Sequence, residues 1–329
     1  MPVSFYQMKK AEKKQRRWKR KIILSILLLS FLYLLSTVGY YLLPWSVRKP
    51  IYKSFPGVNR ALCVRGFNMM NRLDGLGFGS DVAVDFHPKL KSKTVYGGLP
   101  TSYCFTPRIL KNKSYTEGYS DPLKNPYWVA YQIFKVDDLE HGKRPGFRID
   151  RRTLARVRPS DYTHSGYDRG HMAPNFAIAT RYGSAGQRET FLMSNVVPQK
   201  PWINRHIWKD LEMLVSKKYS MKYQEVWVIT GPIFKKPIKR LKSGVAIPSA
   251  YYKILIDVKS TDKVRVLAFL IPGKIPPYTR LKTCLVSVDE IEELTQLDFF
   301  PNLSLTEQEE LESHVSRIWP WWGPLTFFD

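Results

Sequence analysis

The sequence predicts an α+β domain that follows a single membrane-spanning helix. A chain of 329 residues, 44% hydrophobic and 24% charged, has the composition of a folded protein with a sizeable core. One stretch of 22 residues carries no charge, which indicates a membrane span. The rest of the chain contains both strand-like and helical patterns of apolar residues. Three cysteines are too few for a disulfide scaffold.

The uncharged stretch runs from Ile22 to Leu43. A helix of that length covers roughly 33 Å, enough for a hydrocarbon core of about 30 Å. Residues 1–21 hold nine basic residues and one acidic residue, so the positive-inside rule predicts a cytoplasmic N-terminus. The alternative is a cleaved signal peptide, but its apolar region is normally about 7–15 residues long. We therefore expect an uncleaved anchor, with most of the chain outside the cytoplasm.

The positive charge extends well beyond this N-terminal segment. Lys and Arg number 52 and Asp and Glu 28, which gives a net charge of +24; residues 1–21 account for +8, so +16 remains on residues 22–329. A charge of this size favours a polyanionic partner, either nucleic acid or an anionic membrane surface.

The apolar patterns predict the elements of the globular part. One segment, Ile203 to Lys218, has apolar residues at helical spacing. Ser304 and Glu307 form a capping-box pattern that predicts the start of a second, short helix. We expect Trp202 and Trp208 to lie in the core rather than to serve as platforms on which bases stack. Four segments rich in aromatic and β-branched residues are predicted strands: Tyr127–Phe134, Val226–Thr230, Tyr251–Val258 and Val264–Ile271.

These patterns divide the chain into five parts. In order, they are a basic cytoplasmic tail (1–21), a transmembrane helix (22–43), a juxtamembrane connector (44–95), a globular domain (96–303) and a C-terminal helix with an aromatic tail (304–329). Cys63 and Cys104 could form a disulfide in an oxidising compartment, which the sequence leaves open.

The residues with the clearest chemical meaning begin at Asp168. Asp168, Arg169 and His171 lie within four positions, and we expect Gly170 between them to allow a tight backbone turn. The pKa of an imidazole lies near neutrality, so His171 is a candidate general base. Asp168 has two open interpretations: it supports this site, or it only pairs with Arg169 or another basic residue.

Asn204 and Glu212 follow within the predicted helix. Asn204 offers a hard, neutral oxygen that suits Mg²⁺, although Asn is also a common helix cap. Glu212 lies about 12 Å further along a straight helix, so we expect it to act on the same ion through water rather than directly.

The run from Tyr167 to Pro174, together with later segments, resembles the DNA/RNA non-specific endonuclease family. These are ββα-metal (His-Me finger) nucleases with a D-R-G-H motif, a group that includes endonuclease G. The resemblance covers roughly residues 95–300. The other segments that resemble the family, in family order, are Trp128–Tyr131, Ser194–Gln199, Trp202–Glu212, Thr230–Pro232, Ile247–Tyr251 and Val288–Ile291.

The resemblance implies a ββα-metal fold with a central, mainly antiparallel sheet flanked by helices. It implies that His171 is the general base and that Asn204 is the single protein ligand to Mg²⁺, with Mn²⁺ or Ca²⁺ as alternatives. It also implies that Glu212 holds a metal-bound water. Three further residues match positions that shape or support the site: Asp168, Arg169 and Asn195.

The chain departs from the family pattern at one position. Members often carry an arginine four residues after the glutamate, where this chain has Ser216. Lys217 or Lys218 is a candidate replacement, and Arg144 or Arg148 could match an upstream arginine that contacts phosphate.

We therefore expect a membrane-anchored, metal-dependent endonuclease that cuts DNA and RNA without sequence specificity and leaves 5′-phosphate ends. Two alternatives are a non-catalytic nucleic-acid-binding or uptake protein and a phosphodiesterase for small or lipid-borne substrates. The expected location is a bacterial inner membrane with the domain in the periplasm, or else a mitochondrial inner membrane. The oligomeric state is open, a homodimer included.

Overall fold

The computed structural model describes residues 83–223, 225–258 and 263–318. It also describes shorter N-terminal stretches at 18–19, 21–26, 28–33, 36–37, 39–40, 43, 45–55, 58 and 62. The chain divides into two compact units, Met1–Gly79 and Ser80–Asp329, which are described separately.

The first unit contains the predicted membrane span. The described residues between 18 and 40 are helical, and apolar side chains such as Leu24 and Leu29 are exposed. The span predicted over 22–43 also includes residues 27, 34–35, 38 and 41–42, which lie outside the described residues. Within the described part of the chain, no helix is both long and apolar enough to cross a bilayer. A further helix, α2, follows at Trp45–Ser54.

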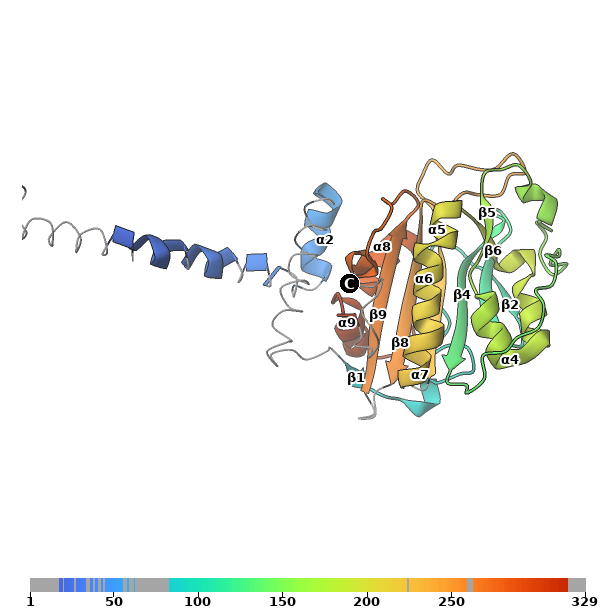
Figure 1. Cartoon of the computed structure of the whole chain (residues 1–329), viewed down its shortest axis with the longest axis horizontal. Helices are drawn as coiled ribbons and strands as arrows, with labels where there is room; N and C mark the ends of the chain where they lie inside the picture. The colour runs from blue at the N-terminus through green and yellow to red at the C-terminus, as the bar shows by residue number, and fades with distance from the viewer. Residues whose placement is uncertain are drawn as a thin grey trace, which may run out of the picture. The chain divides into compact units, whose positions relative to one another are not determined.

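The second unit is built on an antiparallel sheet of eight strands (Figure 1). The strands lie in the order β1-β9-β8-β7-β4-β3-β2, and β10 pairs with β9. Their bounds are β1 (Val84–Asp85), β2 (Arg108–Lys111), β3 (Tyr115–Ser120), β4 (Asn125–Phe134), β7 (Glu225–Ile233), β8 (Ala250–Val258), β9 (Lys263–Pro272) and β10 (Leu285–Val286).

The four strands predicted from the sequence are confirmed as β4, β7, β8 and β9, each longer than predicted by one to four residues. The sequence did not predict β3, because its hydrophobic pattern is interrupted by Thr116 and by the fully buried Glu117. The compact unit begins at Ser80, and β1 pairs with β9, so the sheet starts upstream of the predicted domain boundary at residue 96.

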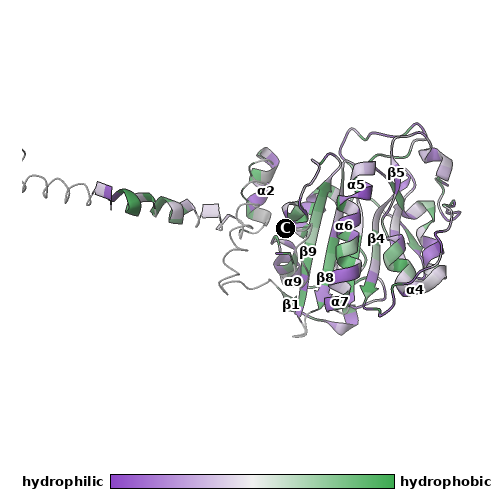
Figure 2. Cartoon of the chain, viewed as in Figure 1, coloured by the Kyte–Doolittle hydropathy of each residue, from purple (hydrophilic) through white to green (hydrophobic). Residues whose placement is uncertain are grey.

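Both faces of the sheet are covered. On one face, Trp128, Trp227 and Tyr252 pack with residues of α8 (Val288–Thr295) and α9 (Leu305–Glu312). The opposite face lies against α4 (Asn175–Thr190), α6 (Ile207–Met213) and the small β5–β6 sheet. Burial on two faces explains why β8 and β9 are almost continuously apolar, as Figure 2 shows in green.

The long helix predicted over Ile203–Lys218 is not continuous. The chain forms α5 (Pro201–Arg205), breaks at His206 (φ −122°, ψ −100°), and resumes as α6. A π-helical turn at Leu214–Tyr219 and α7 (Ser220–Tyr223) complete the segment. The apolar period survives the break because α5 and α6 pack on the same side of the sheet, so the pattern alone could not reveal it (Figure 1).

The predicted capping box is confirmed at the start of α9. Ser304 accepts a hydrogen bond from the backbone of Glu307, and the Glu307 side chain accepts one from the backbone of Ser304. The aromatic tail from residue 319 onward lies outside the described residues, as does Cys63, so the tail and the disulfide stay predictions.

Candidate functional site

The residues singled out by sequence lie on a β-hairpin followed by a helix. The hairpin consists of β5 (Asp168–His171) and β6 (Val196–Gln199), and α5 begins two residues after β6. The pairing sets Asp168 opposite Gln199 and His171 opposite Val196. Asp168 therefore lies beside the start of the helix, and His171 lies at the other end of a four-residue strand.

The tight turn predicted at Gly170 is wrong, because Gly170 lies inside the extended strand β5. The glycine is needed for a different reason. A Cβ atom at this position would overlap the side chain of Gln199 on the facing strand. Gly170 thus allows close approach across the hairpin rather than a change of chain direction.

Asp168 joins the hairpin to α5. Its carboxylate accepts a hydrogen bond from Asn204 Nδ2 at 3.0 Å and two from the Arg205 guanidinium, both at 2.8 Å. Burial alone would raise the pKa of Asp168, but the hydrogen bonds from Arg205 and Asn204 outweigh it and hold the pKa below its usual value. Asp168 pairs with Arg205, so the predicted pairing with a basic residue is met by an arginine other than Arg169.

This contact also fixes the orientation of the Asn204 amide. Because Nδ2 donates to Asp168, the carbonyl oxygen Oδ1 must point away from that carboxylate, and it is the atom able to bind a cation. Asn204 lies within α5, whose N-cap is Lys200, so the helix-cap interpretation of Asn204 is wrong.

His171 forms a cluster with two aromatic rings whose own centroids lie 5.0 Å apart. Its imidazole is 5.2 Å from the Phe147 ring and 4.9 Å from the Phe191 ring, measured between centroids. Nε2 is buried without a hydrogen-bond partner. Burial, and then the charge of Arg144, lower the pKa of His171 to about 3. The ring is therefore neutral across the physiological range, and its pKa lies well below the value near neutrality that the sequence suggested.

Two arginines contact this aromatic cluster. The Arg144 guanidinium lies 5.7 Å from the centre of the Phe191 ring, and that of Arg169 lies 5.5 Å from the centre of the Phe147 ring. Arg169 donates two hydrogen bonds to the Pro159 carbonyl and so has a structural partner. Arg144 is exposed and lowers the pKa of both His171 and Glu212, which places its charge near both groups.

Glu212 lies on α6 with its Oε1 buried and without a hydrogen-bond partner. Burial raises the pKa of its carboxyl group, an effect that nearby Lys253 and Arg144 only partly offset. Lys253, on β8, is itself buried, and its Nζ donates to the Tyr131 hydroxyl at 3.1 Å. Sequence reasoning missed Lys253 because it lies in an apolar strand far from the motif, and only the fold brings its Nζ to 4.5 Å from the centre of the Trp208 ring on α6.

Asn195 supports the loop that follows β5. Its Nδ2 donates to the carbonyls of Ala173 and Thr190, and its Oδ1 accepts from the Ala173 backbone at 2.8 Å. Three hydrogen bonds to backbone leave this buried amide no capacity for a ligand at those atoms, so Asn195 acts on the position of the chain after His171.

The candidate replacements for the missing arginine differ in their surroundings. Ser216 is buried and donates to the Glu212 carbonyl. Lys217 lies over the Phe176 ring at 5.2 Å. Arg148 donates to the Arg188 carbonyl. Among the positions considered from sequence, the charge of Arg144 is the one that acts on both His171 and Glu212.

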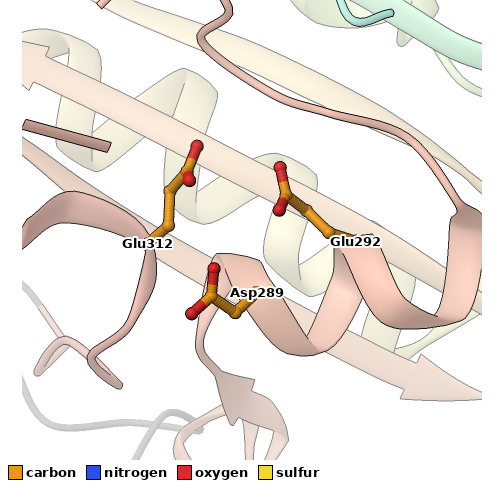
Figure 3. A group of neighbouring side chains, drawn as sticks. All are labelled: Asp289, Glu292 and Glu312. Atoms are coloured by element: carbon orange, nitrogen blue, oxygen red, sulfur yellow. The ribbon is translucent and has the colours of Figure 1, made fainter. Parts of the chain in front are cut away.

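A second group of carboxylates lies on the opposite face of the sheet. Asp289, Glu292 and Glu312 have oxygens within 4.8 Å of one another, and Figure 3 shows Glu292 and Glu312 turned toward each other. Glu292 accepts a hydrogen bond from the Phe299 backbone at 2.7 Å, whereas Glu312 Oε1 is buried without a partner. Because α8 and α9 pack behind the sheet, this cluster does not belong to the site around Asp168.

The comparisons with known proteins agree with this geometry. The model of a family described as DNA/RNA non-specific endonuclease matches residues 94–306. A nuclease of Nostoc sp. is 33% identical over 234 residues, covering 67% of this chain and 83% of that protein. A nuclease of Serratia marcescens is 30% identical over 259 residues, covering 75% and 94%.

Human mitochondrial endonuclease G is 30% identical over 212 residues, covering 60% of this chain and 70% of that protein. Among solved structures, one of an EndoG/EndoGI complex matches with a TM-score of 0.54 and 26% identity, covering 60% of this chain and 88% of that chain. The family resemblance inferred from the motifs, and the α+β fold with a central antiparallel sheet, are thereby confirmed.

The anchoring of Asn204 by Asp168 leads to a first prediction. Asp168→Ala leaves the amide free to rotate and should weaken binding of Mn²⁺ by about 10- to 100-fold, the usual effect of losing a residue that orients a metal ligand. Isothermal titration of the folded protein measures this directly. Asp85→Ala, which removes an exposed carboxylate paired with Lys263, is the control. Unchanged Mn²⁺ affinity in Asp168→Ala would show that Asn204 does not hold the ion.

The carboxylate pair behind the sheet leads to a second prediction. Burial raises the pKa of Glu292 to about 8, and burial and the charge of Glu292 raise that of Glu312 further. The folded state therefore holds protons that the unfolded chain releases near its usual carboxyl pKa of about 4.3. The free energy of unfolding should fall as pH rises from there through about 8, by up to about 1.4 kcal/mol per pH unit for one proton.

Glu312→Gln removes one of these titrations and should flatten this decline. Urea denaturation in EDTA at a series of pH values measures the slope, and Glu310→Gln, an exposed position on the same helix, is the control. Equal slopes in the wild type and Glu312→Gln would mean that the pair is already ionised at neutral pH.

Proposed function

Because the chain belongs to the DNA/RNA non-specific endonuclease family, we propose that its own hairpin and helix hydrolyse the phosphodiester bonds of DNA and RNA. The observation that carries this proposal is the contact between Asp168 and Asn204. It joins the first residue of the D-R-G-H strand to the amide whose oxygen is the candidate metal ligand. His171 lies on the same strand with a neutral ring.

A divalent cation fits this group of residues. The Asn204 carbonyl oxygen is the type of ligand that Mg²⁺ and Mn²⁺ accept alongside several waters, and the unpartnered Oε1 of Glu212 can accept a hydrogen bond from such a water. When bound, the cation would supply positive charge to the phosphate oxygens and to the leaving oxygen.

The side chains divide the remaining work. His171 accepts a proton from the attacking water through Nδ1, since Nε2 is closed off from solvent. Arg144, exposed beside His171 and Glu212, binds the negative charge that grows on the phosphate. Phe147 and Phe191 hold the imidazole in place and keep it neutral beside these cations.

The bond changes follow from these roles. The water oxygen forms a bond to phosphorus while the bond from phosphorus to the 3′-oxygen breaks, and the leaving oxygen takes up a proton. The products are a 3′-hydroxyl and a 5′-phosphate. The charge of +16 on residues 22–329 favours contact with the sugar-phosphate backbone, which carries no sequence information and so suits cutting at many sequences.

Replacing the base tests the catalytic assignment. His171→Ala should lower plasmid and RNA cleavage in Mg²⁺ by at least about 100-fold, the contribution expected of a general base, while binding of DNA in EDTA is retained. His87→Ala, a histidine paired with Glu307 on another part of the domain, should cut normally. If His171→Ala cuts as fast as the wild type, the site is misassigned. If the wild type binds nucleic acid without cutting it, the non-catalytic alternative replaces this proposal. If the wild type prefers a small diester to DNA and RNA, the phosphodiesterase alternative replaces it.

The two upstream arginines can be separated by a matched pair of variants. Arg144→Ala should lower kcat by about 100-fold, the typical effect of losing one group that stabilises a transition state. Arg148→Ala, whose guanidinium is bound to the Arg188 carbonyl, should change kcat little if the protein stays folded. A large loss of kcat in Arg148→Ala together with a small one in Arg144→Ala would assign the phosphate contact to Arg148.

We also propose that residues 22–43 anchor the protein in a membrane, with the nuclease outside the cytoplasm, in the bacterial periplasm or between mitochondrial membranes. The absence of charge over 22 residues and the basic block before them support this. The full chain should float with liposomes in a sucrose gradient at high salt, and residues 44–329 should not. Flotation of both, or of neither, contradicts the anchor.

A further inference from the structure

A groove of about 520 Å³ lies beside α5, the helix that carries Asn204. Its volume falls within the range typical of sites for small molecules. One wall comes from the start of α5 and the other from the loop after β9. The lining residues are Lys200, Trp202, Ile203, Gly273, Lys274, Ile275, Pro276 and Pro277.

Trp202 forms the aromatic wall of this groove. Its indole stacks on the exposed His206 ring at 4.0 Å and an interplanar angle of 27°. The expectation that Trp202 lies in the core is wrong, because its side chain is partly exposed, whereas Trp208 is 1% exposed and does lie in the core. The stack with His206 holds the indole in a fixed orientation at the protein surface.

Tyr278 adds a second aromatic ring beside Trp202. It is 92% exposed, and its ring centre lies 6.1 Å from that of Trp202 in an edge-on arrangement. Its backbone has φ 61°, a region that non-glycine residues rarely adopt. A tyrosine held outward in this way adds no packing to the core, but its ring is placed to contact a ligand that has a flat ring.

The charges at the groove are positive. Lys200 and Lys274 both line it, and Lys200 Nζ lies 5.6 Å from the centre of the Tyr167 ring. Tyr167 immediately precedes Asp168, which holds Asn204. The groove therefore lies close to the candidate metal-binding end of the hairpin, and it combines cations with aromatic rings as single-stranded nucleic acid sites do.

We propose that this groove receives one unstacked base of the substrate strand, next to the phosphate being cut, with the base lying against Trp202 and its phosphates near Lys200 and Lys274. This rests on the proposed nuclease function. A base in a duplex is paired and stacked, and must be unpaired before it can enter such a groove. The chain therefore cuts single strands, or locally opened duplexes, in preference to intact duplex.

The kinetic test compares single-stranded and duplex oligonucleotides of the same sequence. Trp202→Ala should lower the ratio of their kcat/KM values by about 5- to 100-fold, the range that stacking on one aromatic ring contributes. Trp202→Phe should keep most of the ratio. Tyr103→Ala removes an aromatic side chain that is 99% exposed on a different loop; it is the control and should leave the ratio unchanged. An unchanged ratio in Trp202→Ala overturns the proposal.

An abasic scan locates the base. In a short oligonucleotide with one cleavable linkage, removing the base from the position that occupies the groove should slow the wild type by a similar factor. The same removal should slow Trp202→Ala no further, because the contact is already gone. Additive losses at every position would show that Trp202 acts on the fold rather than on a base.

A binding measurement separates this inference from the proposed function. In the His171→Ala background with EDTA, fluorescence anisotropy of a labelled single strand should show Kd rising about 5- to 100-fold when Trp202 is also replaced by Ala. If the wild type cuts nothing but this shift is seen, the groove binds a base and the nuclease proposal fails. If the wild type cuts but Kd is unchanged, the nuclease proposal stands and the groove does not bind a base.

Discussion

The carboxylate of Asp168 is the contact on which the geometry of the site depends. It accepts one hydrogen bond from Asn204 and two from Arg205, and so ties the first residue of β5 to the last turn of α5. Among the contacts described around Asn204, this hydrogen bond is the one that fixes where the carbonyl oxygen of the amide points. The Asp168 carboxylate therefore sets both the docking of α5 on the hairpin and the atom of Asn204 that is offered to a cation.

A second constraint concerns charge. A general base must be neutral, yet the site also needs cations to attract a polyanion. Phe147 and Phe191 reconcile these needs, because they pack with His171 and burial lowers its pKa, while Arg144 contacts Phe191 and stays exposed. Glu212 is also buried, and the charges of Lys253 and Arg144 favour its ionised form.

The sequence predicted what depends on local pattern. The four long strands, the capped helix at Ser304 and the family motif were all readable because neighbouring residues determine them. What it could not predict depends on contacts between distant segments. The room left by Gly170 is filled by Gln199, and the break at His206 is compensated by packing. Lys253 lies on the sheet face that α6 covers, where its charge acts on Glu212. Trp202 was misassigned because a tryptophan is usually buried, and its exposure follows from the stack with His206.

The side chain of Arg205 is 67% exposed, although its partner Asp168 is largely buried. Exposed ion pairs weaken as dissolved ions screen them, within a Debye length of about 8 Å at physiological salt. Salt would thus affect the orientation of the Asn204 amide, because it weakens the ion pair between Arg205 and Asp168. Dissolved ions would also compete with the protein for nucleic acid. A saline medium would therefore weaken two contacts together, the one between the chain and a polyanion and the one that aligns the Asn204 carboxamide.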